Sequence, residues 1–168
     1  MTSKLSRRSV LRGRLSRTDP ERLRPPGAQD DFSRLCTGCG DCARACPEGI
    51  VIRHSSGEPV LDFTKGACTF CNACAEACET GALIPAPASD WPWRAVITDS
   101  CLSLNGIACR ACEDACDARA IRFRLMTAGR AAPVLDADQC TGCGECAFTC
   151  PAGAVSFEAR TPATEEIA

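Results

Sequence analysis

The residues best suited to chemistry in this sequence are its sixteen cysteines, which all fall into four groups. The first, second and fourth groups share the spacing C-x2-C-x2-C-x3-C, and the third has a longer first interval, C-x7-C-x2-C-x3-C. In chain order the groups are Cys36, Cys39, Cys42 and Cys46; Cys68, Cys71, Cys74 and Cys78; Cys101, Cys109, Cys112 and Cys116; and Cys140, Cys143, Cys146 and Cys150. Thiols in such a repeat predict either bound metal or a disulfide framework.

The spacing within each group favours [4Fe–4S] clusters. Three closely spaced cysteines can follow one face of an iron–sulfur cube, and the fourth cysteine then reaches a neighbouring cube. Pro47 and Pro151 complete the bacterial form of this run, while Glu79 and Asp117 replace the proline in the other two groups. Zinc usually takes two separated C-x2-C pairs, and disulfides need an oxidising compartment, so these two alternatives fit less well.

In each two-cluster unit, the fourth cysteine of one group is expected to bind the cluster held by the other group. This crossing rule predicts how the sixteen candidate iron ligands divide among four clusters. The predicted sets are Cys36, Cys39, Cys42 and Cys78; Cys68, Cys71, Cys74 and Cys46; Cys101, Cys109, Cys112 and Cys150; and Cys140, Cys143, Cys146 and Cys116. The four extra residues after Cys101 are expected either to bulge outward or to lay Leu102, Leu104 and Ile107 over the cluster. No cysteine is left for another role.

The elements that must position these cysteines are expected to be short, because large apolar side chains are too scarce for an ordinary core. Apolar runs predict one hairpin from strands at 50–52 and 60–62, and a second from strands at 121–125 and 134–136. Edge strands are expected at 93–98 and 155–157. We therefore predict an α+β fold of two tandem bacterial two-[4Fe–4S] ferredoxin-like units, with a small core nucleated by the cofactors.

This organisation gives provisional domain boundaries. A basic arm is assigned to residues 1–28, a first two-cluster unit to 29–84, a proline-rich linker to 85–92, a second two-cluster unit to 93–160, and a tail to 161–168. Trp91 and Trp93 are expected to pack structurally across the two units. His54, the single histidine, is expected to be an exposed hairpin residue and not a ligand or a base.

Charge is distributed unevenly along the chain. Residues 1–24 carry eight basic and two acidic groups, and the remainder carries eleven basic and nineteen acidic groups, so +6 and −8 give the formal −2. Four bound clusters would add about −8 to the acidic body. The arm is therefore either a solvated basic segment or one that docks on an acidic partner. Its Ser-Arg-Arg at 6–8 looks like a twin-arginine export signal but lacks the apolar stretch behind it.

Several function classes are disfavoured by what the sequence lacks. No run approaches the roughly 18 apolar residues of a membrane span, and the acidic body would repel nucleic acid. No phosphate loop, Ser/His/Asp set or flavin fingerprint accompanies the cysteines, so we expect no catalytic residue and no enzyme. Two classes remain: an accessory factor that matures a partner, and a plain electron carrier or wiring subunit of a redox complex.

The arm and the stretched third group make a narrower resemblance. Ser6-Arg7-Arg8, Leu11-Arg12-Gly13 and Arg24-Pro25-Pro26, followed by four cubane motifs, resemble the NapF family of ferredoxin-type proteins in periplasmic nitrate reductase systems. The resemblance implies a cytoplasmic protein that associates with the reductase catalytic subunit before export and helps to install or reduce its iron–sulfur cluster. On this resemblance the partner-binding candidates in the arm are Arg7, Arg8, Arg12 and Arg14.

Overall fold

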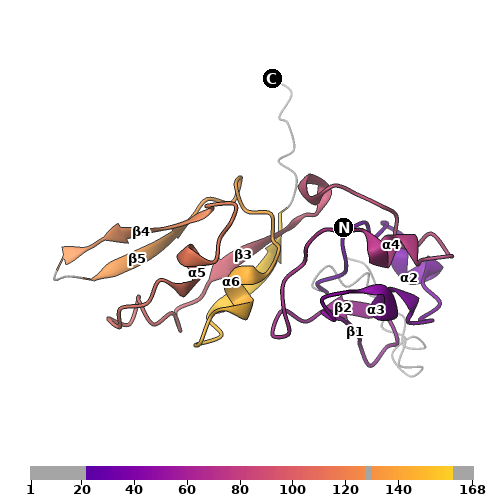
Figure 1. Cartoon of the computed structure of the whole chain (residues 1–168), viewed down its shortest axis with the longest axis horizontal. Coiled ribbons are helices and arrows are strands. Elements are labelled where there is room, and N and C mark those ends of the chain that lie inside the picture. Colours follow the sequence, from indigo (N-terminus) through magenta and orange to yellow (C-terminus); the bar gives the residue numbers. More distant parts are fainter. Residues whose placement is uncertain (1–21, 128–129, 161–168) are drawn as a thin grey trace, which may run out of the picture.

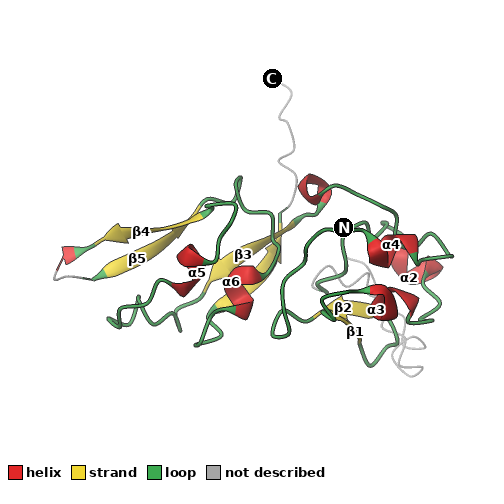
Figure 2. Cartoon of the chain, viewed as in Figure 1, coloured by secondary structure: helices red, strands yellow, loops and turns green. Residues whose placement is uncertain are grey.

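A computed structural model describes residues 22–127 and 130–160, and short elements alternate with long loops (Figures 1 and 2). In chain order the elements are α2 Phe32–Leu35, α3 Asp41–Ala45, β1 Val51–Arg53, β2 Pro59–Leu61, α4 Ala73–Glu76, the 3-10 helix η1 Ala88–Asp90, β3 Trp93–Ile97, α5 Ala111–Asp114, β4 Ile121–Leu125, β5 Ala131–Leu135, α6 Glu145–Phe148 and β6 Val155–Ala159. The helices α3, α4, α5 and α6 each carry the third cysteine of one group, so these helices are extensions of the cysteine loops.

The chain forms two units that repeat the same plan, with β3 leading from the first unit into the second (Figure 1). In the first unit β1 pairs antiparallel with β2, and a single bridge joins Ala28 to Leu83. In the second unit β4 pairs antiparallel with β5, and β3 pairs antiparallel with β6. This arrangement confirms the predicted hairpins and edge strands. The strand β5 starts at Ala131, earlier than predicted, because its ladder with β4 continues toward the turn.

The core of the first unit is aromatic and reaches into the second unit. Trp91 and Trp93 are buried, which confirms the expectation that they pack structurally. The ring centroid of Phe63 lies 6.3 Å from that of Trp91, edge-on, and 4.8 Å from that of Phe157 on β6. Such aromatic pairs contribute about 0.5–1.5 kcal/mol each beyond the area that they bury. Phe63 therefore joins the two units.

Gly144 makes this contact between the units possible. Its backbone has φ +92°, and a Cβ atom there would lie 2.2 Å from the Phe63 ring. Only glycine combines that left-handed conformation with so close an approach. The loop that carries the fourth cysteine group therefore packs directly on the first unit.

The chain from Arg22 onward packs against the first unit. Arg22 and Arg24 form ion pairs with Glu58 at 3.2 and 3.7 Å, and the N–H of Leu61 donates to the Leu23 carbonyl at 2.8 Å. The guanidinium carbon of Arg24 lies 4.6 Å from the Phe32 ring centroid. This segment falls within the range assigned to the arm, yet it covers the β1–β2 hairpin. Arg7, Arg8, Arg12 and Arg14 lie outside the described residues, as does the tail 161–168.

The helices that the structure describes are all short. None of the helices within 22–127 and 130–160 is long and apolar enough to cross a bilayer.

Candidate metal centres

One cavity of the first unit is lined by four cysteines from two different groups. Cys36, Cys39 and Cys42 come from the first group, and Cys78 is the last cysteine of the second. Phe32 and Leu83 add apolar walls to the same cavity. The structure thus brings together the first set that the crossing rule predicts.

A second cavity holds the complementary set. Cys68, Cys71 and Cys74 line it together with Cys46, the last cysteine of the first group. Its other walls are largely apolar and include Ile50, Val51, Leu61 and Phe70. A cavity with four thiols and an apolar lining suits a soft, sulfur-rich cofactor shielded from water.

In the second unit the cysteines gather in the same crossed fashion. Burial raises the pKa of Cys112 to about 11, and the nearby Cys101, Cys150 and Cys109 add to this rise through their charge. Burial, with the charges of the neighbouring cysteines, raises the pKa of Cys146 to about 12. The cysteines acting on Cys146 are Cys143, Cys140, Cys112 and Cys116, which are the other three members of the predicted fourth set and one member of the third.

The same physical cause acts on the first unit. Burial raises the pKa of Cys42, Cys68 and Cys74 to about 11. Without metal these side chains are neutral thiols at pH 7. Metal binding must therefore displace their protons, which couples loading of the sites to proton release.

Backbone N–H groups point at the last cysteine of three groups. Leu83 donates to Cys78 Sγ at 3.4 Å, Ala120 to Cys116 Sγ at 3.3 Å, and Ala154 to Cys150 Sγ at 3.3 Å. At Cys78, burial raises the pKa, but hydrogen bonds from Thr80, Leu83 and Ala82 outweigh it, and the net pKa is lowered. Donors of this kind favour the thiolate form and tune the potential of a bound cluster.

Two cysteine groups from different units lie side by side. The N–H of Cys68 donates to the carbonyl of Cys143 at 2.7 Å, and the charge of Cys143 contributes to the raised pKa of Cys68. The second and fourth groups therefore meet where the two units touch. Cysteine spacing carries no signal of this contact, because it depends on how the linker folds back.

The spacing of the thiols differs from that of a single-ion site. Within residues 22–127 and 130–160, no three His, Cys, Asp or Glu side chains are gathered tightly enough to hold one metal ion. A tetrahedral zinc site with Zn–S bonds near 2.3 Å would place its sulfurs about 3.8 Å apart. In an iron–sulfur cube each thiolate binds a different iron, so its ligands stand further apart. Four thiols and a largely apolar lining in each of the two cavities of the first unit fit [4Fe–4S] groups.

Two smaller expectations concern residues near the cysteines. Leu104 and Ile107 are exposed, so the loop after Cys101 bulges outward, while Leu102 is partly buried. Ser103 is buried in this loop, and its hydroxyl donates to the Ala131 carbonyl at the start of β5. His54 is exposed and contacts neighbouring serines, as expected of a hairpin residue.

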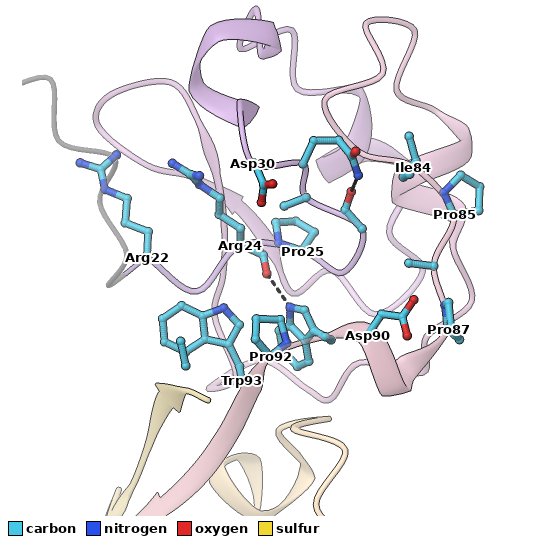
Figure 3. A pocket seen from close by; sticks show the side chains of 16 residues that line it. Arg22, Arg24, Pro25, Asp30, Ile84, Pro85, Pro87, Asp90, Pro92 and Trp93 are labelled. Atoms are coloured by element: carbon cyan, nitrogen blue, oxygen red, sulfur yellow. Dashed lines mark hydrogen bonds between the residues drawn. The ribbon is translucent and has the colours of Figure 1, made fainter. Parts of the chain in front are cut away.

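A separate surface cavity lies between the N-terminal segment and the linker (Figure 3). Arg22, Arg24 and Asp30 line one side, and Asp90, Pro92 and Trp93 line the other. The indole N–H of Trp91 donates to the Arg24 carbonyl at 3.2 Å, which ties the two sides together. No cysteine lines this cavity, and its described contacts are those of packing.

Comparison with family models agrees with the two-unit plan. Residues 35–83 and residues 107–154 each match a model described as a 4Fe-4S dicluster domain. The first match contains both cysteine groups of its unit. The second begins after Cys101, so the stretched loop departs from the common pattern. Two dicluster domains are consistent with four clusters.

Similar proteins cover nearly the whole chain. The ferredoxin-type protein NapF of Haemophilus influenzae is 40% identical over 164 residues, which cover 91% of this chain and 93% of the relative. NapF of Escherichia coli is 37% identical over 155 residues, covering 91% and 94%. The methylamine utilization ferredoxin-type protein MauM of Methylorubrum extorquens is 37% identical over 158 residues, covering 82% and 72%.

Proposed function

The chain belongs to the NapF family of ferredoxin-type proteins, and from this membership we propose a specific role for it. It is a cytoplasmic accessory protein with four [4Fe–4S] clusters. Its partner is the catalytic subunit of a periplasmic nitrate reductase, which it matures before export by inserting or reducing an iron–sulfur cluster. The membership confirms the resemblance inferred from the arm and the third group, and the finer role is the proposal.

The observation that carries the iron–sulfur part is the crossed gathering of cysteines. Two cavities each hold three cysteines of one group and the last cysteine of the other. We propose that all sixteen cysteines ligate iron, in the four sets predicted from their spacing. When bound, the clusters would supply one-electron redox chemistry.

The chain's own residues prepare these sites. Apolar side chains such as Phe32 and Phe70 line the cavities and keep water from the thiols. The N–H groups of Leu83, Ala120 and Ala154 hold negative charge at the last cysteines. The bond between Cys68 and Cys143 fixes the loops of the two units against each other. These contacts support a rigid redox protein, and we assign no catalytic residue.

We further propose that the arm binds the reductase subunit through Arg7, Arg8, Arg12 and Arg14. The two arginines nearer the first unit have a different role. Arg22 and Arg24 are held by Glu58 and belong to the folded body. A deletion that tests the arm should therefore end at residue 21, because removing residues 22–24 would also uncover the first hairpin.

The alternative function is a general electron-transfer ferredoxin or a wiring subunit of a redox complex. The specific observation in its favour is the relative MauM, whose name places the same architecture in methylamine utilization. A carrier must dock and leave, so it needs no stable complex with one partner. Partner specificity is the property that separates the two functions.

The deciding experiment is anaerobic. The holoprotein is loaded with radiolabelled iron, mixed with the cluster-free reductase catalytic subunit and separated from it again. Label and nitrate reductase activity gained together by the subunit would establish cluster insertion. Label retained here while the subunit's own cluster becomes reduced would establish electron supply. The maturation proposal fails if the two proteins form no complex, and deletion of residues 1–21 should abolish that complex.

A further inference from the structure

The outer face of the β4–β5 hairpin carries arginines and apolar groups. Side chains alternate along a strand, and the register pairs Arg122 with Val134 and Arg124 with Ala132. The next pair outward is Met126 with Arg130, whose carbonyl accepts the Met126 N–H at 2.7 Å. These six residues therefore share one face, which we call the hairpin face.

The arginines of the hairpin face lack the partners that other arginines have. Within the described parts of the chain, the arginines with no carboxylate, hydroxyl or carbonyl partner are Arg119, Arg122, Arg124 and Arg130. No acidic residue occurs between positions 118 and 135. Arg124 contacts only the sulfur of Met126, at 4.0 Å. The hairpin face is therefore basic and unneutralised, while the rest of the body is acidic overall.

Apolar exposure accompanies this charge. On the hairpin face, Val134 is 51% exposed and Met126 is 42% exposed. Exposed apolar groups rimmed by charge are a feature of protein interaction sites. Arginine and methionine are also among the residues enriched at protein interfaces.

The first unit shows what the equivalent face looks like when it is covered. The sequence Pro-Val-Leu-Asp occurs at 59–62 and again at 133–136, and each aspartate donates its N–H to the facing strand at 2.8 Å. Counting from this repeat, Glu58 corresponds to Ala132, and Ile52 corresponds to Arg122. Glu58 binds Arg22 and Arg24 of the chain's own N-terminal segment.

The second unit has the opposite charges at these positions. Ala132 stands where the first unit has the acidic Glu58, and Arg122 stands where it has the neutral Ile52. The complementary group must then be acidic, and no described segment supplies it. We propose that the hairpin face of β4–β5 is a docking surface for an acidic patch on a partner protein, distinct from the arm. The partner's identity, the reductase catalytic subunit, rests on the function proposed above.

The hairpin is fixed to the third cysteine group, so docking there has a direct consequence. The N–H of Phe123 donates to Glu113 on α5 at 3.2 Å, and the Arg110 guanidinium carbon lies 5.5 Å from the Phe123 ring centroid. Ser103 ties the loop after Cys101 to β5. A partner seated on the hairpin face would therefore lie across the β4–β5 hairpin from α5, the helix that carries Cys112.

The first test is charge reversal in the full-length holoprotein. Binding to the purified reductase catalytic subunit is measured for Arg122→Glu/Arg124→Glu and for the control Arg34→Glu/Lys65→Glu, which changes net charge equally on exposed positions of the first unit. We expect about a tenfold loss of affinity for the first variant and less than about a twofold change for the control. The affinity of the wild-type protein should decrease when salt is raised from about 0.05 M to about 0.3 M. The affinity of the hairpin variant should decrease less over the same range.

A second test does not depend on the variants' folding equally well. A photocrosslinking residue is placed at Val134 or at Val60, the same position of the repeat in the two units. We expect a crosslink to the catalytic subunit from position 134 and none from position 60. Equal affinity of both charge variants, crosslinks from both positions, or a crosslink from 134 only to a second copy of this chain would overturn the docking surface.

Failure of the docking surface is distinguishable from failure of the proposed function. If wild-type protein binds the catalytic subunit and the hairpin variant binds equally well, only the docking surface is wrong. If wild-type protein does not bind the subunit at all, both the partner and the docking surface are wrong. Competition by a random DNA duplex at about 0.15 M salt would also overturn the proposal, since it would assign the hairpin face to phosphate.

Discussion

The two units share a plan but differ in what fills them. The buried core of the first unit includes Phe32, Ile50, Phe63 and Trp91. The buried core of the second consists of alanines, one isoleucine and two of the cysteines. Apolar burial stabilises in proportion to area, at about 25 cal/mol per Å². We therefore expect the first unit to keep part of its structure without metal, and the second unit to depend on bound metal for its fold.

Removing iron tests this contrast with the largest expected effect. Anaerobic chelation of the full chain should leave partial amide protection in β1–β2 but speed exchange in β4–β5 by about a hundredfold or more, because structural metal supplies folding free energy. Hydrogen exchange followed by mass spectrometry measures both hairpins in one sample, with the holoprotein as reference. An equal loss of protection in the two hairpins would show that the aromatic core gives the first unit no independence.

Trp91→Ala tests how much the aromatic core of the first unit contributes to stability. Trp91 is buried, packs edge-on against Phe63 and Phe70, and donates to the Arg24 carbonyl. Truncating it should lower the free energy of unfolding by about 3–5 kcal/mol. Leu125→Ala is the control, because that side chain is 81% exposed and its loss should cost less than about 0.5 kcal/mol. Denaturant unfolding of the holoproteins, followed by circular dichroism, gives both values.

Gly144→Ala tests the contact between the two units at the Phe63 ring. The new Cβ would collide with the Phe63 ring, and φ +92° adds strain, so we expect destabilisation by about 2–3 kcal/mol. Gly106→Ala has φ +82° and open space around the Cβ, so it carries the strain without the collision. If the two variants lose equal stability in thermal or denaturant unfolding, the Phe63 contact contributes nothing.

Glu58→Gln should have the smallest effect. It removes the carboxylate that holds Arg22 and Arg24 on the first hairpin, and partly buried ion pairs of this kind contribute about 1 kcal/mol. The N–H of Leu61, which donates to Leu23, should then exchange faster. Glu79→Gln removes an equal charge at an exposed position and serves as the control. Unchanged exchange at Leu61 would mean that contacts other than the ion pairs with Glu58 hold the segment in place.

Local spacing made much of the fold and of the candidate site predictable. A C-x2-C-x2-C-x3-C run specifies a loop and a short helix, and β4 begins and ends where its apolar run does, at Ile121 and Leu125. The crossed gathering of Cys46 and Cys78 was also predictable, because it follows from the direction of the chain after each loop. Such features depend only on neighbours in sequence.

Long-range contacts were not predictable. Nothing near Glu58 indicates that it binds Arg22 and Arg24, and nothing in the second or fourth group indicates that Cys68 and Cys143 meet. The basic character of the β4–β5 hairpin could have been predicted from the sequence, since no acidic residue lies between Arg119 and Arg130. Summing charge over the whole body concealed it, because the acidic residues elsewhere outnumber these arginines.

Because Phe63 and Phe157 bring the two units into contact, the linker between them also keeps the two contacting surfaces close together. A covalent connection of this length keeps the two units at a high effective concentration, so they meet without a bimolecular association step. A chain cut between Pro85 and Pro92 would lose that advantage and leave aromatic surface exposed on each fragment. The fragments would then reassociate only above a threshold concentration, and below it each would be prone to self-association.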